Sequence, residues 1–90
     1  YTLDTLGWIL VHLGQYDAAV AELSRAIRLD SDYALSYYHL GEAYRRAGRF
    51  EEAVQVIESG LLPAKAQNQA ELVGLMEASL AKARAREGAA

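Results

Sequence analysis

Cysteine is absent from this 90-residue chain, and proline occurs only once. The lack of cysteine excludes a disulfide framework and any thiol chemistry. No apolar run approaches the ~18 residues that a membrane-spanning helix needs, so we expect no insertion into a membrane. Basic residues are not in excess, because nine Lys and Arg accompany twelve Asp and Glu, for a net charge of −3. We therefore expect no binding to nucleic acid, which requires a basic face.

What the chain does contain favours an all-α protein. Hydrophobic residues make up 52% of it, and helix-forming residues such as Ala, Leu and Glu dominate. A chain of this length makes one small domain at most and buries about 60–65% of its unfolded surface. It opens without methionine and shows no leader, which indicates a fragment or a processed product. We expect it to be soluble, and cytoplasmic rather than periplasmic.

Two segments that lie 34 residues apart resemble each other: DTLGWILVHLGQYDAAV at residues 4–20 and YHLGEAYRRAGRFEEAV at residues 38–54. The matches fall on small, apolar and aromatic positions, which decide how closely helices pack. Glycine inside a helix costs up to ~1 kcal/mol relative to alanine, so its recurrence there predicts a close helix crossing. Glycine at the end of a helical pattern predicts a left-handed turn residue. The matched pairs are Leu6 and Leu40, Gly7 and Gly41, Gly14 and Gly48, Tyr16 and Phe50, Ala19 and Ala53, and Val20 and Val54.

The 34-residue period, the Leu-Gly pair, the aromatic and the later alanine resemble the tetratricopeptide repeat (TPR) family, twice over between Leu3 and about Leu62. The resemblance implies an all-α fold, in which antiparallel helix hairpins stack into a right-handed superhelical α-solenoid. We expect repeat 1 over residues 1–32, repeat 2 over residues 33–63 and a C-terminal capping helix over residues 64–90. A degenerate third repeat is the alternative for the last segment. Pro63 predicts that the second helix of repeat 2 ends by Leu61.

Apolar residues follow helical spacing in the first and last segments. Leu6 and Leu10 are expected to face the partner helix of their hairpin, so that Trp8 points away from it. Trp8 then either contributes to a binding surface or packs on neighbours or an upstream repeat. The two apolar stripes are Leu3, Leu6, Leu10 and Leu13, and Leu72, Leu75, Met76, Leu80 and Ala83.

The resemblance implies a non-catalytic protein-interaction module that holds a partner peptide or helix in a concave groove. Trp8 and Tyr38 would clasp an apolar side chain, and Arg45 or Arg46 would pair with an acidic group. TPR domains that clamp a C-terminal carboxylate carry a Lys and an Asn where this chain has Asp4 and Trp8, so that subclass is not expected. The run from Asp4 to Trp8 resembles bacterial TPR proteins and suggests a bacterial assembly or envelope scaffold. The positions that match the groove are Asp4, Trp8, Val11, His12, Leu35, Tyr38, His39, Glu42, Arg45 and Arg46.

Two other functions stay open. Roughly three repeats are usually needed to bury a continuous core, so the end near Leu3, Trp8 and Leu10 would stack on a second copy or exchange helices with it. This alternative is a self-assembly module that forms homo-oligomers. A metal site or enzyme built on the two histidines with Asp4 and Glu42 is less favoured, because the ligands lack a tight spacing. We therefore predict no metal, no cofactor and no catalytic residue.

Overall fold

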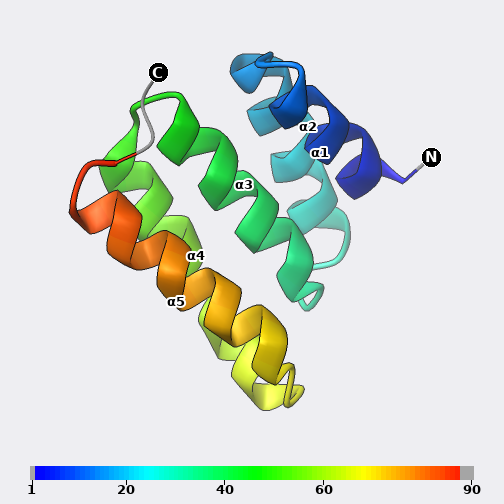
Figure 1. Ribbon diagram of the computed structural model, residues 1–90. Coiled ribbons are helices and arrows are strands. Elements are labelled where there is room, and N and C mark those ends of the chain that lie inside the picture. Colours follow the sequence, from blue (N-terminus) through cyan, green and yellow to red (C-terminus); the bar gives the residue numbers. More distant parts are fainter. Residues whose placement is uncertain (1, 88–90) are drawn as a thin grey trace.

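The computed structural model describes residues 2–87, which contain five α-helices and no strand. The pairs α1–α2 and α3–α4 form two antiparallel hairpins, and α5 packs along α4 and α3 (Figure 1). The expected all-α, TPR-like stack of hairpins is confirmed. Repeat 1 is expected to begin at residue 1 and the capping helix to end at residue 90. Residue 1 and residues 88–90 lie outside the described residues, so these two bounds are not compared with the structure. The helices are α1 (Leu3–His12), α2 (Tyr16–Leu29), α3 (Ala34–Arg46), α4 (Phe50–Ala66) and α5 (Ala70–Arg84).

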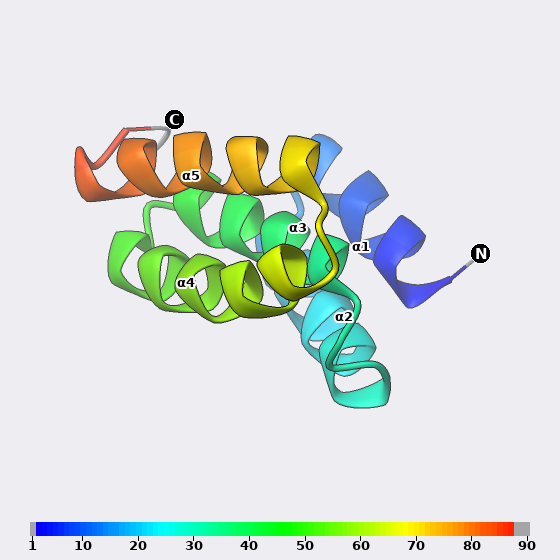
Figure 2. The same cartoon turned by 90° about the horizontal axis from the view of Figure 1, so that it is seen from below.

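The helices lie in two layers, as Figure 2 shows. One layer holds α1, α3 and α5, with α3 set back between the other two, and the second layer holds α2 and α4. The surface of the α1, α3 and α5 layer that faces away from α2 and α4 is called the inner face, because it corresponds to the concave side of a TPR solenoid. The first helix of each repeat therefore supplies this face, as the resemblance implies.

Glycine ends the first helix of each hairpin, as predicted. Gly14 and Gly48 have φ angles of 76° and 81°, in the left-handed region that side chains disfavour. The backbone N–H of Gly14 donates to the carbonyl of Val11 at 3.0 Å, and that of Gly48 donates to Arg45 at 3.0 Å. These bonds satisfy carbonyls that a helix end leaves free.

Glycine also permits the close crossing inside each hairpin. A methyl group at Gly7 would overlap the Leu23 side chain, and one at Gly41 would overlap Ile57. Leu23 and Ile57 are fully buried. The predicted close approach is therefore confirmed, and the residue that fills the space lies four positions after the buried alanine of each second helix.

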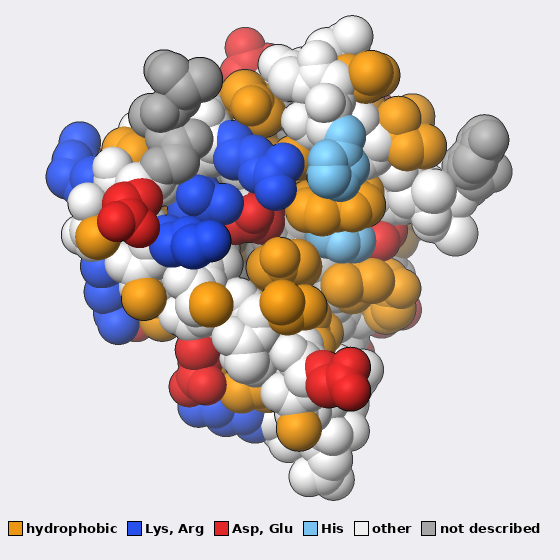
Figure 3. Space-filling view, viewed as in Figure 1, with side chains coloured by type: hydrophobic (Ala, Val, Ile, Leu, Met, Phe, Trp, Pro, Cys, Tyr) orange, Lys and Arg blue, Asp and Glu red, His pale blue; other side chains and the backbone are white. Residues whose placement is uncertain are grey.

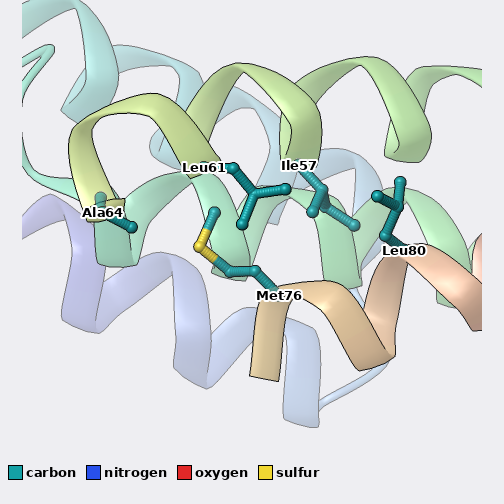
Figure 4. Close-up of a cluster of buried hydrophobic side chains, with 6 residues drawn as sticks. Ile57, Leu61, Ala64, Met76 and Leu80 are labelled. Atoms are coloured by element: carbon teal, nitrogen blue, oxygen red, sulfur yellow. The ribbon is translucent and has the colours of Figure 1, made fainter. Parts of the chain in front are cut away.

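Two hydrophobic clusters form the core. The first joins the hairpins through Val11, Leu23 and Leu40. The second joins α4 to α5, where Met76 extends towards Leu61 (Figure 4). Because each cluster takes side chains from consecutive units, no unit buries its apolar surface alone.

Helix α4 continues through Pro63 to Ala66, so the predicted end at Leu61 is wrong. Proline removes one backbone donor, which leaves the carbonyl of Ser59 without its helical partner. Ser59 is exposed, so water can bind this carbonyl. Leu61 and Ala64 are buried in the cluster with α5, and that burial offsets the local cost of the proline.

The predicted apolar stripe on α1 is only partly buried, because Leu10 packs against the first core cluster whereas Leu6 and Leu13 are exposed. Gly7 and Val11 occupy the side that faces α2, whereas Leu6 is 38% exposed and Leu13 is 63% exposed. The expectation that Leu6 faces its hairpin partner is therefore wrong, because a small residue is needed at the crossing. Leu75, expected in the buried stripe of α5, is also 52% exposed.

Candidate functional site

Trp8 is the centre of an aromatic cluster on the inner face. Its ring stacks on His39, with centroids 4.1 Å apart and planes 17° apart. His12 meets the same ring edge-on at 4.6 Å, and Tyr38 lies at 6.0 Å. The Arg46 guanidinium carbon lies 5.5 Å from the ring centroid. Figure 3 shows histidine, hydrophobic and basic side chains together on this face. Trp8 thus packs on neighbours within the chain and still keeps part of its surface accessible.

A buried carboxylate holds the stacked histidine in place. His39 Nδ1 lies 2.9 Å from Asp4 Oδ1, and the Ser36 hydroxyl donates to the same oxygen at 3.0 Å. An ionised carboxylate only accepts, so the imidazole N–H is the donor in the first bond. All three side chains are buried. The ring beneath Trp8 is consequently fixed by contacts that join α1 to α3.

A second buried network surrounds Glu42, one turn further along α3. Arg45 donates to both carboxylate oxygens at 2.8 Å, and Arg46 adds a bond at 3.1 Å. The Ser79 hydroxyl of α5 donates at 2.6 Å. Arg45 also donates to the carbonyl of Glu87 at 3.2 Å. This network therefore ties α5 to α3 beneath the inner face.

The network sets the protonation of its members. Burial by itself raises the pKa of the Glu42 carboxyl, but the hydrogen bonds from Arg45 and Ser79, with the charges of Arg45 and Arg46, outweigh it and lower that pKa to about 2. The hydrogen bond to Glu42 raises the pKa of Arg45. Burial and then the charge of Glu42 raise the pKa of Tyr38, so its hydroxyl stays a donor at neutral pH.

Acid is expected to remove the contribution of Glu42 to stability. Because the folded-state pKa lies below the ordinary value of 4.5, this contribution is complete above pH 4.5 and is lost as the pH falls towards 2. The difference in unfolding free energy between the wild type and Glu42→Gln should shrink over this range in urea titrations. Glu52→Gln serves as the control, because Glu52 pairs with Arg49 at the surface, where its side chain is 44% exposed. A difference that stays constant between pH 5 and pH 3 would contradict the assignment.

The structure divides the ten residues predicted for the groove into two sets. One set is buried and holds the other in position: Asp4, Val11, His39, Glu42 and Arg45. The other set keeps accessible surface: Trp8, His12, Leu35, Tyr38 and Arg46. Both arginines contact Glu42, but the Arg45 side chain is 10% exposed and the Arg46 side chain is 30% exposed, so Arg46 is the more accessible cation.

The four residues of the metal hypothesis do not come together. Asp4 contacts His39, whereas Glu42 is occupied by two arginines and a serine, and His12 packs on Trp8. Among residues 2–87, no group of three or more potential ligands is close enough to hold a metal ion. Within the same part of the chain, no helix is long and apolar enough to cross a membrane.

Sequence reasoning missed Ser36 and Ser79, each of which donates to a buried carboxylate. The two residues in each of these bonds are separated by 32 and 37 positions, so no local pattern indicates them. The pairing of Glu42 with Arg45 did leave a signal, because opposite charges three residues apart share a helix face.

A separate cleft of about 310 Å³ lies away from the aromatic cluster. The ends of α1, α2 and α3 line it, with Leu3, Ala26 and Tyr33 among its apolar residues. Asp4 and Ser36 reach its wall, but Trp8, His12, Tyr38 and Arg46 do not. The inner face and the cleft are therefore different surfaces.

Comparison with known proteins gives two family matches. A model described as TPR repeat matches residues 7–48, and a second, described as tetratricopeptide repeat, matches residues 36–71. Together they reach from the first hairpin into the start of α5. No solved structure gives a significant match.

Two curated relatives share part of the chain. The "ER protein translocation subcomplex subunit sec67" of Schizosaccharomyces pombe is 34% identical over 65 residues, which is 72% of this chain and 34% of that protein. The "Small glutamine-rich tetratricopeptide repeat-containing protein 2" of Mycosarcoma maydis is 33% identical over 49 residues, which is 54% of this chain and 14% of that protein. The chain thus spans about a third of the first relative and about a seventh of the second.

Both of these relatives come from eukaryotes, so the suggestion of a bacterial source is not supported. The family assignment, in contrast, rests on agreement between independent observations. The 34-residue internal period, the stacked hairpins and the two matching family models describe the same architecture. This chain belongs to the tetratricopeptide repeat family.

Proposed function

We propose that the inner face binds a short segment of a partner protein, with Trp8 as the apolar anchor and Arg46 as the cation. TPR repeats generally mediate protein–protein interaction, and the proposed role is non-catalytic. The observation that carries the proposal is the stacking of the Trp8 ring on His39. The His39 imidazole is in turn fixed by its hydrogen bond to the buried Asp4 carboxylate. The first relative is named as a subunit of a translocation subcomplex, which agrees with a role in protein assembly.

The stack prepares Trp8 for binding before a partner arrives. A side chain that is already ordered loses little conformational entropy on association, so more of its contact energy appears as affinity. Tryptophan is also enriched among the residues that dominate binding energy. Leu35, Tyr38 and His12 keep accessible surface on the same helices, and they border the anchor in this proposal.

Arg46 shares the single charge of Glu42 with Arg45, so the two arginines leave an excess of positive charge on this face. Glu42 already receives two hydrogen bonds from Arg45 and one from Ser79. The Arg46 side chain is 30% exposed and lies near the Trp8 ring. A carboxylate of the partner would pair with this guanidinium. The preferred segment therefore carries an apolar side chain close to Asp or Glu.

Selection of binders from a random peptide display library tests this preference. We expect peptides that combine a bulky apolar residue with a neighbouring Asp or Glu, and their affinity should fall with added salt. Trp8 is the only tryptophan in the chain, so its fluorescence reports binding at the proposed site. Trp8→Ala should weaken the selected peptides at least about tenfold, measured by calorimetry, because hot-spot truncation costs about 2 kcal/mol or more.

Matched variants separate the site from general effects. Arg46→Ala should weaken acidic peptides several-fold and reduce their salt dependence, whereas Arg25→Ala on the outer helix α2 should change neither. Circular dichroism establishes that each variant is folded. Folded Trp8→Ala and Arg46→Ala proteins that bind the selected peptides as well as the wild type would contradict the proposal.

A further inference from the structure

His12 occupies in the first repeat the place that Arg46 occupies in the second. The two residues lie 34 positions apart, which is the period of the repeat. Each is the last residue of the first helix of its hairpin, because α1 ends at His12 and α3 ends at Arg46. Equivalent positions of stacked repeats present their side chains on the same side of a solenoid. The inner face therefore has, at the same place in both repeats, a residue that can carry a positive charge.

Both side chains lie against the ring of Trp8. The His12 ring meets it edge-on with centroids 4.6 Å apart, and the Arg46 guanidinium carbon lies 5.5 Å from its centroid. His12 is exposed, whereas His39, which stacks on the same ring, is buried and bonded to Asp4. Figure 3 shows histidine side chains on either side of a hydrophobic band, with basic side chains beside it. Of the two histidines, His12 is therefore the one that a partner can reach.

The charge that His12 can carry depends on pH, because histidine becomes positive as the pH falls from about 8 to 5. Around Trp8, α3 contributes the charge of Arg46 and α1 contributes the buried Asp4 carboxylate, while α2 has the exposed Asp17 in its first turn. Two positive charges beside one ring repel each other, and a bound carboxylate would offset this repulsion. Binding of an acidic partner and protonation of His12 therefore favour each other.

We propose that His12 is a second, pH-dependent cation of the inner face, which binds an acidic side chain of the partner segment. This inference rests on the proposed function, because the segment is the one that Trp8 anchors. Arg45 and Arg46 share the single charge of Glu42, which leaves one positive charge in excess, and protonated His12 adds another. The face therefore matches a segment with two acidic side chains near its apolar residue at pH 6, and a segment with one at pH 8.

Calorimetry of the whole chain with a selected peptide that carries two acidic side chains tests the inference. Its affinity should rise about two- to fivefold between pH 8 and pH 6, the range expected for one added exposed ion pair. The Glu42 carboxyl, with a pKa of about 2, and the Tyr38 hydroxyl, whose pKa burial raises, keep their charge states over this range. The Asp and Glu of the peptide also stay ionised. A version of the peptide with both acids changed to amides should bind equally at the two pH values.

Two variants of the same residue assign the pH dependence. His12→Gln should remove the rise. His12→Arg, which places in repeat 1 the residue that repeat 2 carries, should bind the peptide as tightly at pH 8 as at pH 6. Circular dichroism establishes that both variants are folded. A rise that persists in folded His12→Gln would assign it to His39 and overturn the inference.

The failure of this inference is distinguishable from the failure of the proposed function. An affinity of the wild type that does not change between pH 8 and pH 6 would overturn the role of His12. Peptide binding that still depends on Trp8 and Arg46 would then leave the proposed function in place. Peptides that bind Trp8→Ala as tightly as the wild type would overturn both.

Discussion

Glu42→Ala is expected to lower the free energy of unfolding by about 3–5 kcal/mol. The carboxylate is 4% exposed and accepts hydrogen bonds from Arg45, Arg46 and Ser79. Its removal leaves the Arg45 guanidinium buried without its counter-charge, and an uncompensated buried charge is strongly unfavourable. Domains are commonly stable by only about 5–15 kcal/mol, so this single change removes a large part of the total.

The exposed pair Arg49 and Glu52 provides a matched control. Its two hydrogen bonds, at 2.7 and 2.8 Å, have the same bidentate form and the same three-residue spacing. Both side chains are 44% exposed, and exposed pairs contribute little to stability because water and salt screen their charges. Urea unfolding of Glu42→Ala and Glu52→Ala should therefore give very different losses. Equal losses would contradict the role assigned to burial.

A combined variant distinguishes an unpaired charge from lost packing. Replacing both Glu42 and Arg45 by Met removes the buried charges and keeps apolar volume. Such replacements are often neutral or stabilising, so the double variant should be more stable than Glu42→Ala. Hydrogen exchange in α5 should increase in Glu42→Ala, because Ser79 then loses its bond to α3. Unchanged exchange in α5 would show that this bond does not hold the helix.

Gly60→Ala is expected to destabilise the protein by about 1–3 kcal/mol, although alanine favours helices more than glycine does. A methyl group at this position would overlap the Tyr37 Cβ, which is fixed to the backbone of α3, as well as the Met76 terminus. Met76 can move, but Tyr37 Cβ moves only with its helix. The variant therefore forces α3 and α4 apart along the core cluster that binds α5.

Gly74→Ala is the matched control for this prediction. Gly74 lies within α5 and is exposed, and no atom outside its own helix backbone lies within 4 Å of an added methyl group. The change should stabilise the protein by about 0.5–1 kcal/mol through helix propensity. Opposite shifts in the midpoint of thermal unfolding are expected for the two variants. Stabilisation by both would show that the crossing at Gly60 tolerates a methyl group.

The repeat also explains why glycine stands at this position in only one copy. The equivalent residue in the first hairpin is Ala26, which lines the cleft of about 310 Å³ together with Leu3. An open cleft leaves room for the methyl group of alanine. At Gly60 the two helices instead meet closely at Tyr37. The two copies therefore differ because the neighbouring helices lie very close together at Gly60, whereas a cleft lies beside Ala26.

The sequence by itself determined the helical hairpins and their turns, because these depend on short-range periodicity. The left-handed residues Gly14 and Gly48 and the crossings at Gly7 and Gly41 follow from their places in the helical pattern and their recurrence after 34 residues, and the structure confirms them. The same local reasoning placed the end of α4 too early, at Leu61, because it considered Pro63 and took no account of burial against α5.

Only the tertiary structure decided which polar residues support the inner face. Asp4 meets Ser36 and His39, and Glu42 meets Ser79, across 32 to 37 residues of chain. Such pairs form where separate helices pack, so their geometry depends on how far the units approach and rotate. The resemblance to the TPR family implied that Trp8, Arg45 and Arg46 lie on the same side of the solenoid. Packing then buried Arg45 against Glu42 and left Trp8 and Arg46 partly accessible.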